Sequence, residues 1–396
     1  MSSSLDSCME LASSDVKLTP LKDLAEFQRG DSITKKSSEE GEYPVISGGQ
    51  KPAYYINQFN RTGETITVAG SGAYAGFVMY WNKPIFVSDA FSIKVDEQRL
   101  LPRYAYHFLL SMQDKIHALK LGSGVPHVYA KDVAKIPIPI PFPNNRIQSL
   151  AIQAGIVRIL DSFSGLVDKL EAELICRKRQ YEYFLNHLLS FDHENLSDDV
   201  SWYQINELFD IRNGYTPSKS NQDFWDGGDI PWFRIDDIRD NGRFLSDSIQ
   251  HITSKGVKGK LFPANSIILA TSATIGEHAL LQVEALSNQR FTNFAVRDSF
   301  AKQLIPKFVF YYFFKIDKWC EHNTNVSSFA AVDMTKLKAL KFPIPPLTVQ
   351  ERIVGILDNF DRLCHDAKVG IPAELAARRK QYEFFREMLL NFSKSE

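Results

Sequence analysis

The sequence predicts an α+β chain that is a tandem duplication, in which a mixed α/β domain is followed each time by a long helix. Three observations support this fold class. Apolar residues repeat with heptad spacing between Arg146 and Phe191, a relative of that segment ends the chain, and short β-rich runs precede both segments in the same order. Because an apolar seam cannot remain open to water, we expect the two helices to pair as an antiparallel coiled coil.

The first long helix is predicted to run without interruption, because no proline lies between Arg146 and Phe191. At 1.5 Å per residue it would span roughly 60 Å, about two turns of B-DNA. Its seam residues are spaced by threes and fours, with Arg177 filling one gap. They are Ile156, Leu160, Phe163, Val167, Leu170, Leu174, Tyr181, Phe184 and Leu188.

The second long helix repeats the first in two blocks, because residues 349–358 match 152–161 and residues 378–385 match 177–184. Four additional residues separate the blocks in the second copy, together with Gly370 and Pro372, so we expect this helix to kink or restart near the proline. Its seam residues are Ile353, Leu357, Phe360, Tyr382, Phe385 and Leu389.

Length and composition are those of a globular protein with two or three domains, since 396 residues exceed one ordinary core. The formal net charge of -1 neither favours nor excludes nucleic acid, because binding depends on where cations cluster. The longest apolar run, 308–314, is too short to cross a bilayer, so we expect no membrane contact. The scattered cysteines form neither a zinc pattern nor a disulfide framework and indicate a reducing cytoplasm.

Turn residues and changes in composition divide the chain into five segments. These are a flexible leader over residues 1–16, a first domain over 17–143, a central helix with a polar linker over 144–198, a second domain over 199–346, and a C-terminal helix over 347–396.

The elements expected inside the first domain recur in the second. Strands are predicted at 43–46, 64–69, 76–81 and 91–95, a helix begins at Pro102, and the proline-rich run 136–143 must be extended. The matching runs of the second domain are 230–233, 267–272, 306–314 for the helix, and 342–346 for the proline connector.

A search for catalytic and metal-binding motifs finds none. There is no phosphate-binding Gly-x-x-x-x-Gly-Lys-Ser/Thr loop, no His-Glu-x-x-His pair, no Gly-x-Ser-x-Gly elbow and no Asp-Pro-Pro-Tyr type motif. The isolated histidines His107, His187 and His278 are interpreted as packing or surface residues. The carboxylates Asp236, Asp237 and Asp240 are interpreted as a surface loop. No metal or cofactor is therefore predicted in this chain.

Residues suited to DNA contact are the better candidates. Small and hydroxyl residues follow the second matched strand of each domain, where they let backbone amides approach phosphate and can donate to base edges. A tight turn without a ligand explains them equally well. The candidates are Gln50, Lys51, Arg61, Ser71, Tyr74, Lys120 and His127 in the first domain, and Lys219, Arg234, Ser272, Thr274, Asn288, Arg290 and Asn323 in the second.

Three features of the chain have a counterpart in a known family. They are the duplicated unit, the proline connectors Ile136-Pro-Ile-Pro and Phe342-Pro-Ile-Pro-Pro, and the two helix starts, in which Gln153 and Gln350 precede the pattern Ile-Val-x-Ile-Leu-Asp. Over nearly its whole length the chain resembles the DNA-specificity (S) subunit of type I restriction-modification systems. The resemblance implies two target recognition domains, each reading one half of a bipartite DNA sequence, and helices that set the unread gap. It implies no catalysis by this chain.

The resemblance also implies partners. These are double-stranded DNA and two modification subunits that use S-adenosylmethionine to methylate adenine, which two restriction subunits with ATP- and Mg-dependent activity can join. Two other interpretations of the residues stay open: a non-catalytic adaptor whose two heads bind proteins across a coiled-coil spacer, and an enzyme with an unrecognised site in the mixed domains.

Overall fold

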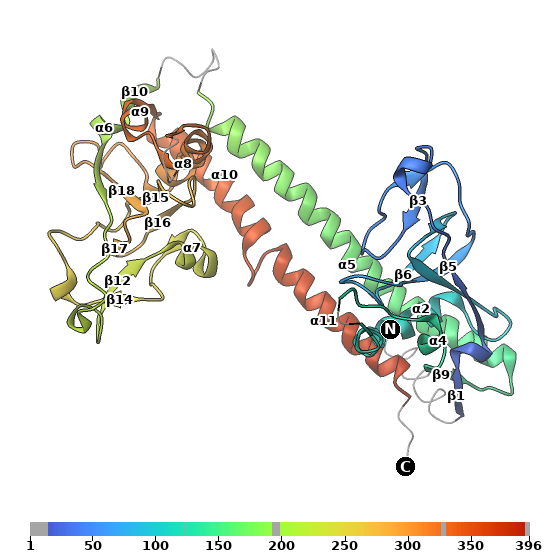
Figure 1. Ribbon diagram of the computed structural model, residues 1–396. Helices are drawn as coiled ribbons and strands as arrows, with labels where there is room; N and C mark the ends of the chain where they lie inside the picture. Colours follow the sequence, from blue (N-terminus) through green and yellow to red (C-terminus); the bar gives the residue numbers. More distant parts are fainter. Residues whose placement is uncertain (1–14, 123, 192–198, 326–329, 393–396) are drawn as a thin grey trace. The chain divides into compact units, whose positions relative to one another are not determined.

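The computed structural model describes residues 15–122, 124–191, 199–325 and 330–392 (Figure 1). The chain divides into two compact units. Unit 1 comprises Met1–Ala172 together with Ala373–Glu396, and unit 2 comprises Glu173–Pro372. Most of the predicted leader and linker, residues 1–14 and 192–198, lie outside the described residues. The first strand begins at Val16, inside the predicted leader.

The domain of unit 1 is built on two small sheets (Figure 1). The larger sheet is antiparallel and has the strand order β2 (Ala25–Arg29), β8 (Ala90–Val95), β5 (Glu64–Ala69), β6 (Val78–Asn82). The smaller sheet is mixed and has the strand order β4 (Tyr55–Ile56), β3 (Tyr43–Ile46), β7 (Phe86–Val87). Helix α2 (Pro102–Ser111) packs on β5 and β6 and buries Tyr104 and Phe108. Strand β6 starts later than predicted, because Gly76 has a φ of 85° and belongs to the preceding turn.

The domain of unit 2 has the same plan with additions. Its larger sheet has the order β11 (Phe209–Asn213), β18 (Phe291–Val296), β15 (Ile267–Ala270), β16 (His278–Leu281), β13 (Phe244–Leu245), and the smaller one the order β14 (His251–Ile252), β12 (Ile230–Phe233), β17 (Leu286–Ser287). Helix α8 (Pro306–His322) takes the place of α2 and also begins at a proline, which suits the first turn of a helix.

The pairing of the strands confirms the duplication predicted from sequence. Strand β3 pairs antiparallel with β4 and parallel with β7, and β12 pairs in the same two ways with β14 and β17. One prediction about unit 2 is wrong. Asp236, Asp237 and Asp240 lie on a helix, α7 (Ile235–Asn241), rather than in a loop. Asp237 is buried, where its carboxylate accepts the backbone N–H groups of Arg234 and Ile249, each at 2.6 Å.

The two proline connectors are extended, as predicted, and each closes its domain. Strand β9 (Pro137–Pro141) pairs antiparallel with β1 (Val16–Pro20), so that Val16 lies opposite Pro141. Strand β21 (Lys341–Ile344) pairs likewise with β10 (Ser201–Gln204). Proline is tolerated in β9 because the sheet has only two strands, while the intervening Ile138 and Ile140 are buried.

The long helices also follow the prediction. Helix α5 runs without a break over Arg146–Leu188, whereas the second copy is split into α10 (Leu347–His365) and α11 (Ile371–Leu390). Gly370 lies in the break, where a Cβ atom would stand 2.5 Å from the carbonyl oxygen of Arg362. Pro372 then falls in the first turn of α11, where its missing N–H costs no helical hydrogen bond.

Within each unit α5 packs antiparallel on the second copy. In unit 1 the ring of Phe163 stacks on Phe385 with centroids 4.8 Å apart, and Arg379 pairs with Glu171 further along. In unit 2 Phe184 stacks on Phe360 at 5.2 Å. Of the predicted seam residues, Ile156, Leu160, Tyr181, Ile353, Leu357 and Leu389 are buried, and Phe163, Val167, Leu170, Leu174, Phe184, Leu188, Phe360, Tyr382 and Phe385 are half-buried. The supercoiling of the helices stays a prediction.

Among the described residues, α5 is by length and composition alone a helix that could cross a membrane. This differs from the expectation based on the apolar run 308–314. Some apolar residues of α5 pack inside the protein: Ile156 and Leu160 lie in the core of unit 1, and Leu185 in the core of unit 2. Others, such as Ile147 and Ile175, are exposed.

Candidate nucleic-acid interface

In unit 1 four predicted residues lie on one edge of the domain. Ser71, in the loop after β5, pairs through its backbone with His127, and the N–H of Gly72 donates to the carbonyl of Pro126 at 3.0 Å. Lys120 donates through Nζ to the carbonyl of Ala73 at 2.9 Å, beside the exposed Tyr74. These loops, together with Asp89, whose carboxylate accepts a hydrogen bond from Ser71 Oγ, form what we call edge 1: residues 70–74, 89 and 120–131 without Ser123.

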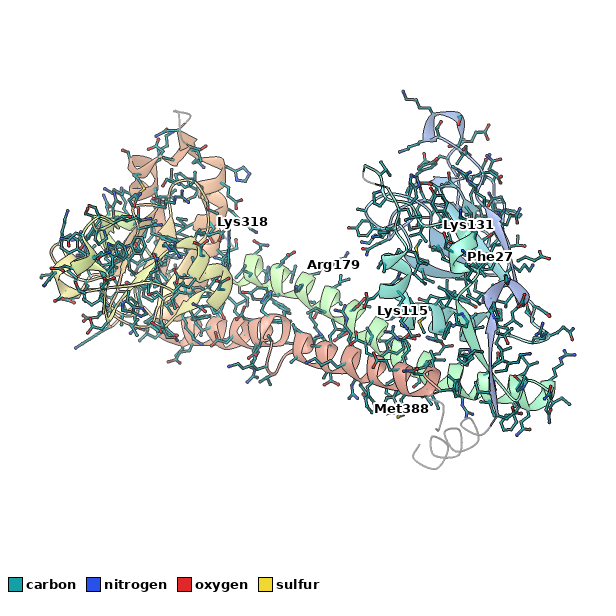
Figure 2. All side chains as sticks on the ribbon, turned by 60° about the horizontal axis from the view of Figure 1, so that its bottom comes forward. Phe27, Lys115, Lys131, Arg179, Lys318 and Met388 are labelled. Atoms are coloured by element: carbon teal, nitrogen blue, oxygen red, sulfur yellow. The ribbon has the colours of Figure 1, made fainter. Side chains whose placement is uncertain are left out.

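Edge 1 also carries exposed apolar and aromatic side chains, of which Tyr74 was predicted and Leu121, Val125 and Tyr129 were missed. Tyr74, Leu121, Val125 and Tyr129 expose between 45% and 58% of their surface. The ring of His127 stacks on Tyr129, and Lys131, labelled in Figure 2, lies with its Nζ 5.5 Å from the centre of that ring. A hollow of about 580 Å³ lies beside them. Exposed apolar groups suit thymine methyl groups, and cations suit phosphate.

In unit 2 five predicted residues lie on the corresponding edge. Ser272 pairs through its backbone with Ala331, and the N–H of Thr271 donates to the carbonyl of Arg290 at 2.9 Å. Asn288 accepts the N–H of Arg290 at 3.0 Å through its side chain. Thr274 belongs to the same loop as Ser272, and Asn323 accepts the N–H of Asp333 at 3.2 Å. We call residues 271–274, 288–290 and 323–333, without 326–329, edge 2.

The remaining predicted residues are placed apart from these contacts. Gln50, Lys51 and Lys219 are exposed in loops. Arg61 is held inside its domain, since its guanidinium donates to Ser92 Oγ at 2.8 Å and to the carbonyls of Asn60 and Arg29 at 2.7 and 2.9 Å. Arg234 is half-buried and lies 3.6 Å from Asp236. Their contacts with DNA stay predictions.

Each domain is fixed to its helix by a buried glutamine of the helix-start motif. Gln153 accepts the N–H of Leu101 at 2.9 Å and donates to the carbonyl of Arg99 at 3.0 Å. Gln350 does the same in unit 2, with the N–H of Ile305 at 2.9 Å and the carbonyl of Gln303 at 2.8 Å. Both amides are fully buried, so they orient the first turn of α2 and of α8.

A carboxylate about two helical turns further on makes a second duplicated contact. Asp161 of α5 pairs with Arg103 and accepts from His107 Nε2 at 2.7 Å. Asp358 of α10 pairs with Lys307 and accepts from the hydroxyl of Tyr311, both at 2.6 Å. Burial lowers the pKa of His107 to about 4, so the imidazole is neutral and donates to Asp161.

The other histidines are packing or surface residues, as predicted. His278 is buried and bonds Asp317 through Nδ1 at 2.6 Å, whereas His187 is exposed on α5. No group of three or more potential metal ligands is found among residues 15–122, 124–191, 199–325 and 330–392.

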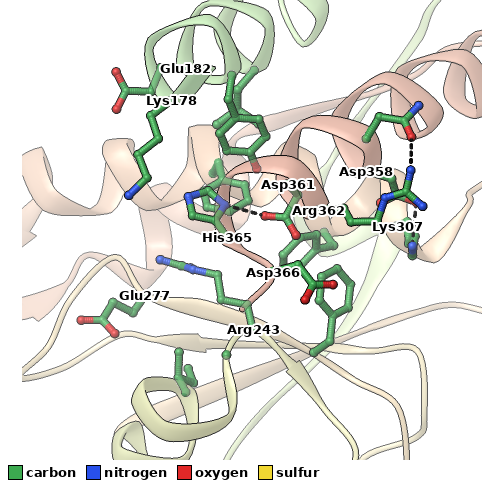
Figure 3. Close-up of a pocket in the computed structure, with 18 of the residues that line it drawn as sticks. Lys178, Glu182, Arg243, Glu277, Lys307, Asp358, Asp361, Arg362, His365 and Asp366 are labelled. Atoms are coloured by element: carbon green, nitrogen blue, oxygen red, sulfur yellow. Dashed lines mark hydrogen bonds and ion pairs between the residues drawn. The ribbon is translucent and has the colours of Figure 1, made fainter. Parts of the chain in front are cut away.

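Unit 2 also contains a charged recess of about 1360 Å³ between its domain and the helices α5 and α10. Lys178, Arg243 and His365 direct their nitrogen atoms toward one side of it (Figure 3). Carboxylates compensate part of this charge, since Asp361 pairs with His365 at 3.0 Å and Asp358 with Lys307. The mixed charge suits a protein surface with several ion pairs better than a single small ligand.

A family model described as "Type I restriction modification DNA specificity domain" matches the chain twice, at residues 13–175 and 197–377. The EcoR124I/EcoR124II type I specificity subunit of Escherichia coli is 34% identical over 311 residues, which cover 76% of this chain and 73% of that protein. The EcoprrI specificity subunit of Escherichia coli is 50% identical over 213 residues, 51% of this chain and about half, 53%, of that protein.

Solved structures show the same fold. The S subunit of a type I restriction-modification system from M. genitalium has a TM-score of 0.61 at 17% identity, covering 95% of this chain and 96% of that one. A chain from a structure on complex assembly and conformational transition of the type I R-M system has a TM-score of 0.58 at 16% identity, covering 96% and 98%.

Proposed function

This chain belongs to the type I restriction-modification DNA specificity family, and from that premise we propose that it selects the DNA sequence on which a type I complex acts. Each domain reads one half of a bipartite, asymmetric target. The observation that carries the proposal is that two domains of one topology expose the same loop edge with different side chains, as two different half-sites require.

The reading surfaces in this proposal are edge 1 and edge 2. Backbone N–H groups, hydroxyls and lysines of these loops contact phosphate, and side chains that reach the base edges carry the sequence preference. The low net charge of the chain is compatible with this role if partner subunits neutralise further phosphates.

The helices act as the spacer in this proposal. Helix α5 contributes to both units as one 43-residue element, so its length sets the number of base pairs that are not read between the half-sites.

Catalysis belongs to the partners, since the relatives are named specificity subunits. Two modification subunits that hold S-adenosylmethionine bind this chain and methylate adenine at N6 in each half-site, and two restriction subunits that use ATP and Mg complete the nuclease. The charged recess of unit 2, which Lys178 lines (Figure 3), and the exposed Arg179 of α5 (Figure 2) offer docking surfaces for them. Because such complexes act on the cell's own DNA, we place the chain in the cytoplasm.

Single-molecule sequencing of the host genome, scored for N6-methyladenine, tests the function. Deletion of the gene should remove methylation from one bipartite motif, and restoring the gene should bring it back. If no motif is lost in a host in which the modification partner is expressed, the proposal fails. Co-purification of the chain with partners other than modification subunits would then favour the two-headed adaptor.

A further inference from the structure

One position occurs in both edges at the same place in the fold. In unit 1 the N–H of Gly70 donates to the carbonyl of Asp89 at 3.1 Å, and in unit 2 the N–H of Thr271 donates to the carbonyl of Arg290 at 2.9 Å. The next residues, Ala90 and Phe291, accept from Gly30 and Gly214, each at 2.9 Å. Asp89 and Arg290 therefore hold the same position relative to the strand that each precedes, β8 or β18, although the turn of unit 2 is one residue longer.

The turn that carries this position is held firmly in both units. The N–H of Ser88 donates to the carbonyl of Ile46 at 2.8 Å, and that of Asn288 to Phe233 at 3.0 Å. The opposite side of the turn contacts a glycine each time. A Cβ atom on Gly30 would lie 2.1 Å from the oxygen of Ser88, and one on Gly214 would lie 2.2 Å from that of Asn288. A side chain on such a turn is presented to a ligand with little loss of backbone entropy.

The side chains of Asp89 and Arg290 are both exposed and have groups available for a ligand. Asp89 accepts a hydrogen bond from Ser71 Oγ through Oδ2, which leaves Oδ1 open. The guanidinium of Arg290 has no hydrogen bond or ion pair with the part of the chain that the structure describes. Equivalent positions therefore present a carboxylate in edge 1 and a guanidinium in edge 2.

We propose that Asp89 and Arg290 are specificity-determining residues: Asp89 reads a base that donates a hydrogen bond in one half-site, and Arg290 reads a base that accepts hydrogen bonds in the other. Arg290 binds guanine, whose O6 and N7 accept two parallel hydrogen bonds in the major groove, and Asp89 accepts from the N4 amino group of cytosine. Adenine is the weaker partner for Asp89, since its N7 lone pair lies beside the amino group and repels a carboxylate. This inference rests on the proposed function and deepens it.

The test replaces each residue with an amide, in the full chain expressed with its modification partner. Arg290→Gln should shift one position of the unit 2 half-site from guanine toward adenine, and Asp89→Asn should shift one position of the unit 1 half-site from cytosine toward adenine, because an amide pairs with adenine N6 and N7. The ratio of methylated sites that carry the two bases should change about ten-fold or more. Each variant should leave the other half-site unaltered.

Lys302→Gln and Glu97→Gln are matched controls, because both residues are exposed charges of the same two domains outside the edges. If a variant methylates too little DNA to be scored, selection of bound duplexes from a pool randomised across the motif gives the same base ratio. A wild-type motif that neither amide variant changes overturns this inference and leaves the proposed function standing. A wild-type chain that directs no methylation overturns both.

Discussion

At the scale of single residues, Gln153 and Gln350 perform the same task in the two units. Each buried amide satisfies one N–H and one carbonyl just before the helix that lies against the domain's sheet. A buried backbone group without a partner costs free energy, so the position requires a side chain that both accepts and donates. Glutamine fulfils this requirement, which gives the helix-start motif a physical reason.

Replacing Gln153 with alanine should lower the free energy of unfolding of unit 1 by about 1–3 kcal/mol, because two buried backbone groups lose their partner. Denaturant-induced unfolding, followed by circular dichroism of the full chain, measures the change. Gln58→Ala, at an exposed loop position, is the control and should change it by less than about 0.5 kcal/mol. Equal effects of the two substitutions would show that the amide does not hold the domain to its helix.

Sequence reasoning at this scale located the loops that the fold brings together in the candidate interface, but not the contacts that they make. Small and hydroxyl residues after a strand identified Ser71 and Ser272, because turn chemistry is local. Tyr129 and Leu121 were missed, because an exposed apolar residue has the same sequence signature as a core residue. Arg61 was predicted to be an available cation, yet its guanidinium donates to the neighbouring carbonyl of Asn60 and to two acceptors distant in sequence, on Ser92 and Arg29.

At the scale of elements, periodicity and proline placement were sufficient for the long helices. The heptad pattern predicted α5, and Gly370 with Pro372 predicted the division into α10 and α11. Helix α7 was not predicted, because seven residues are too few for a 3.6-residue period to be recognised. The buried carboxylate of Asp237 accepts the N–H of Arg234, three residues before it, and that of Ile249, which only the fold brings next to it.

Insertion of one helical turn, four residues, into α5 after Leu170 should change the unread gap of the target and leave both half-sites unaltered. Four residues add about 6 Å to the helix, comparable to the rise of one or two base pairs. Sequencing of the methylated motif measures the gap. The control inserts four residues of similar composition near the C-terminus, after Phe392, where no change is expected. An unchanged gap after the α5 insertion would show that this helix is not the spacer.

At the scale of the whole molecule, the duplication determines most of what could be predicted. The order of strands, the proline connectors and the helices recur, so each half of the sequence served as a check on the other. The individual bases recognised could not be predicted, because direct readout depends on loop geometry and on single side chains, for which Asp89 and Arg290 are the proposed examples.

Exchange of residues 17–143 for the corresponding domain of another family member should change one half of the methylated sequence only. The reason is that the core of unit 1 is separate from that of unit 2, and that edge 1, its proposed reading surface, lies wholly within these residues. Sequencing of the motif before and after the exchange measures the effect. The control replaces the gene segment with one of synonymous codons that encodes the same domain. A change in both halves would refute the assignment of one domain to each half-site.

The pairing of β1 with β9 has a consequence for the exchange of gene segments. Because Val16 lies opposite Pro141, the polypeptide arrives at the domain and departs from it at neighbouring points. The intervening gene segment is therefore a cassette, and a crossover on each side of it delivers an intact new domain to an unchanged pair of helices. Under the proposed function, such an exchange replaces one half of the recognised DNA sequence and keeps the helices.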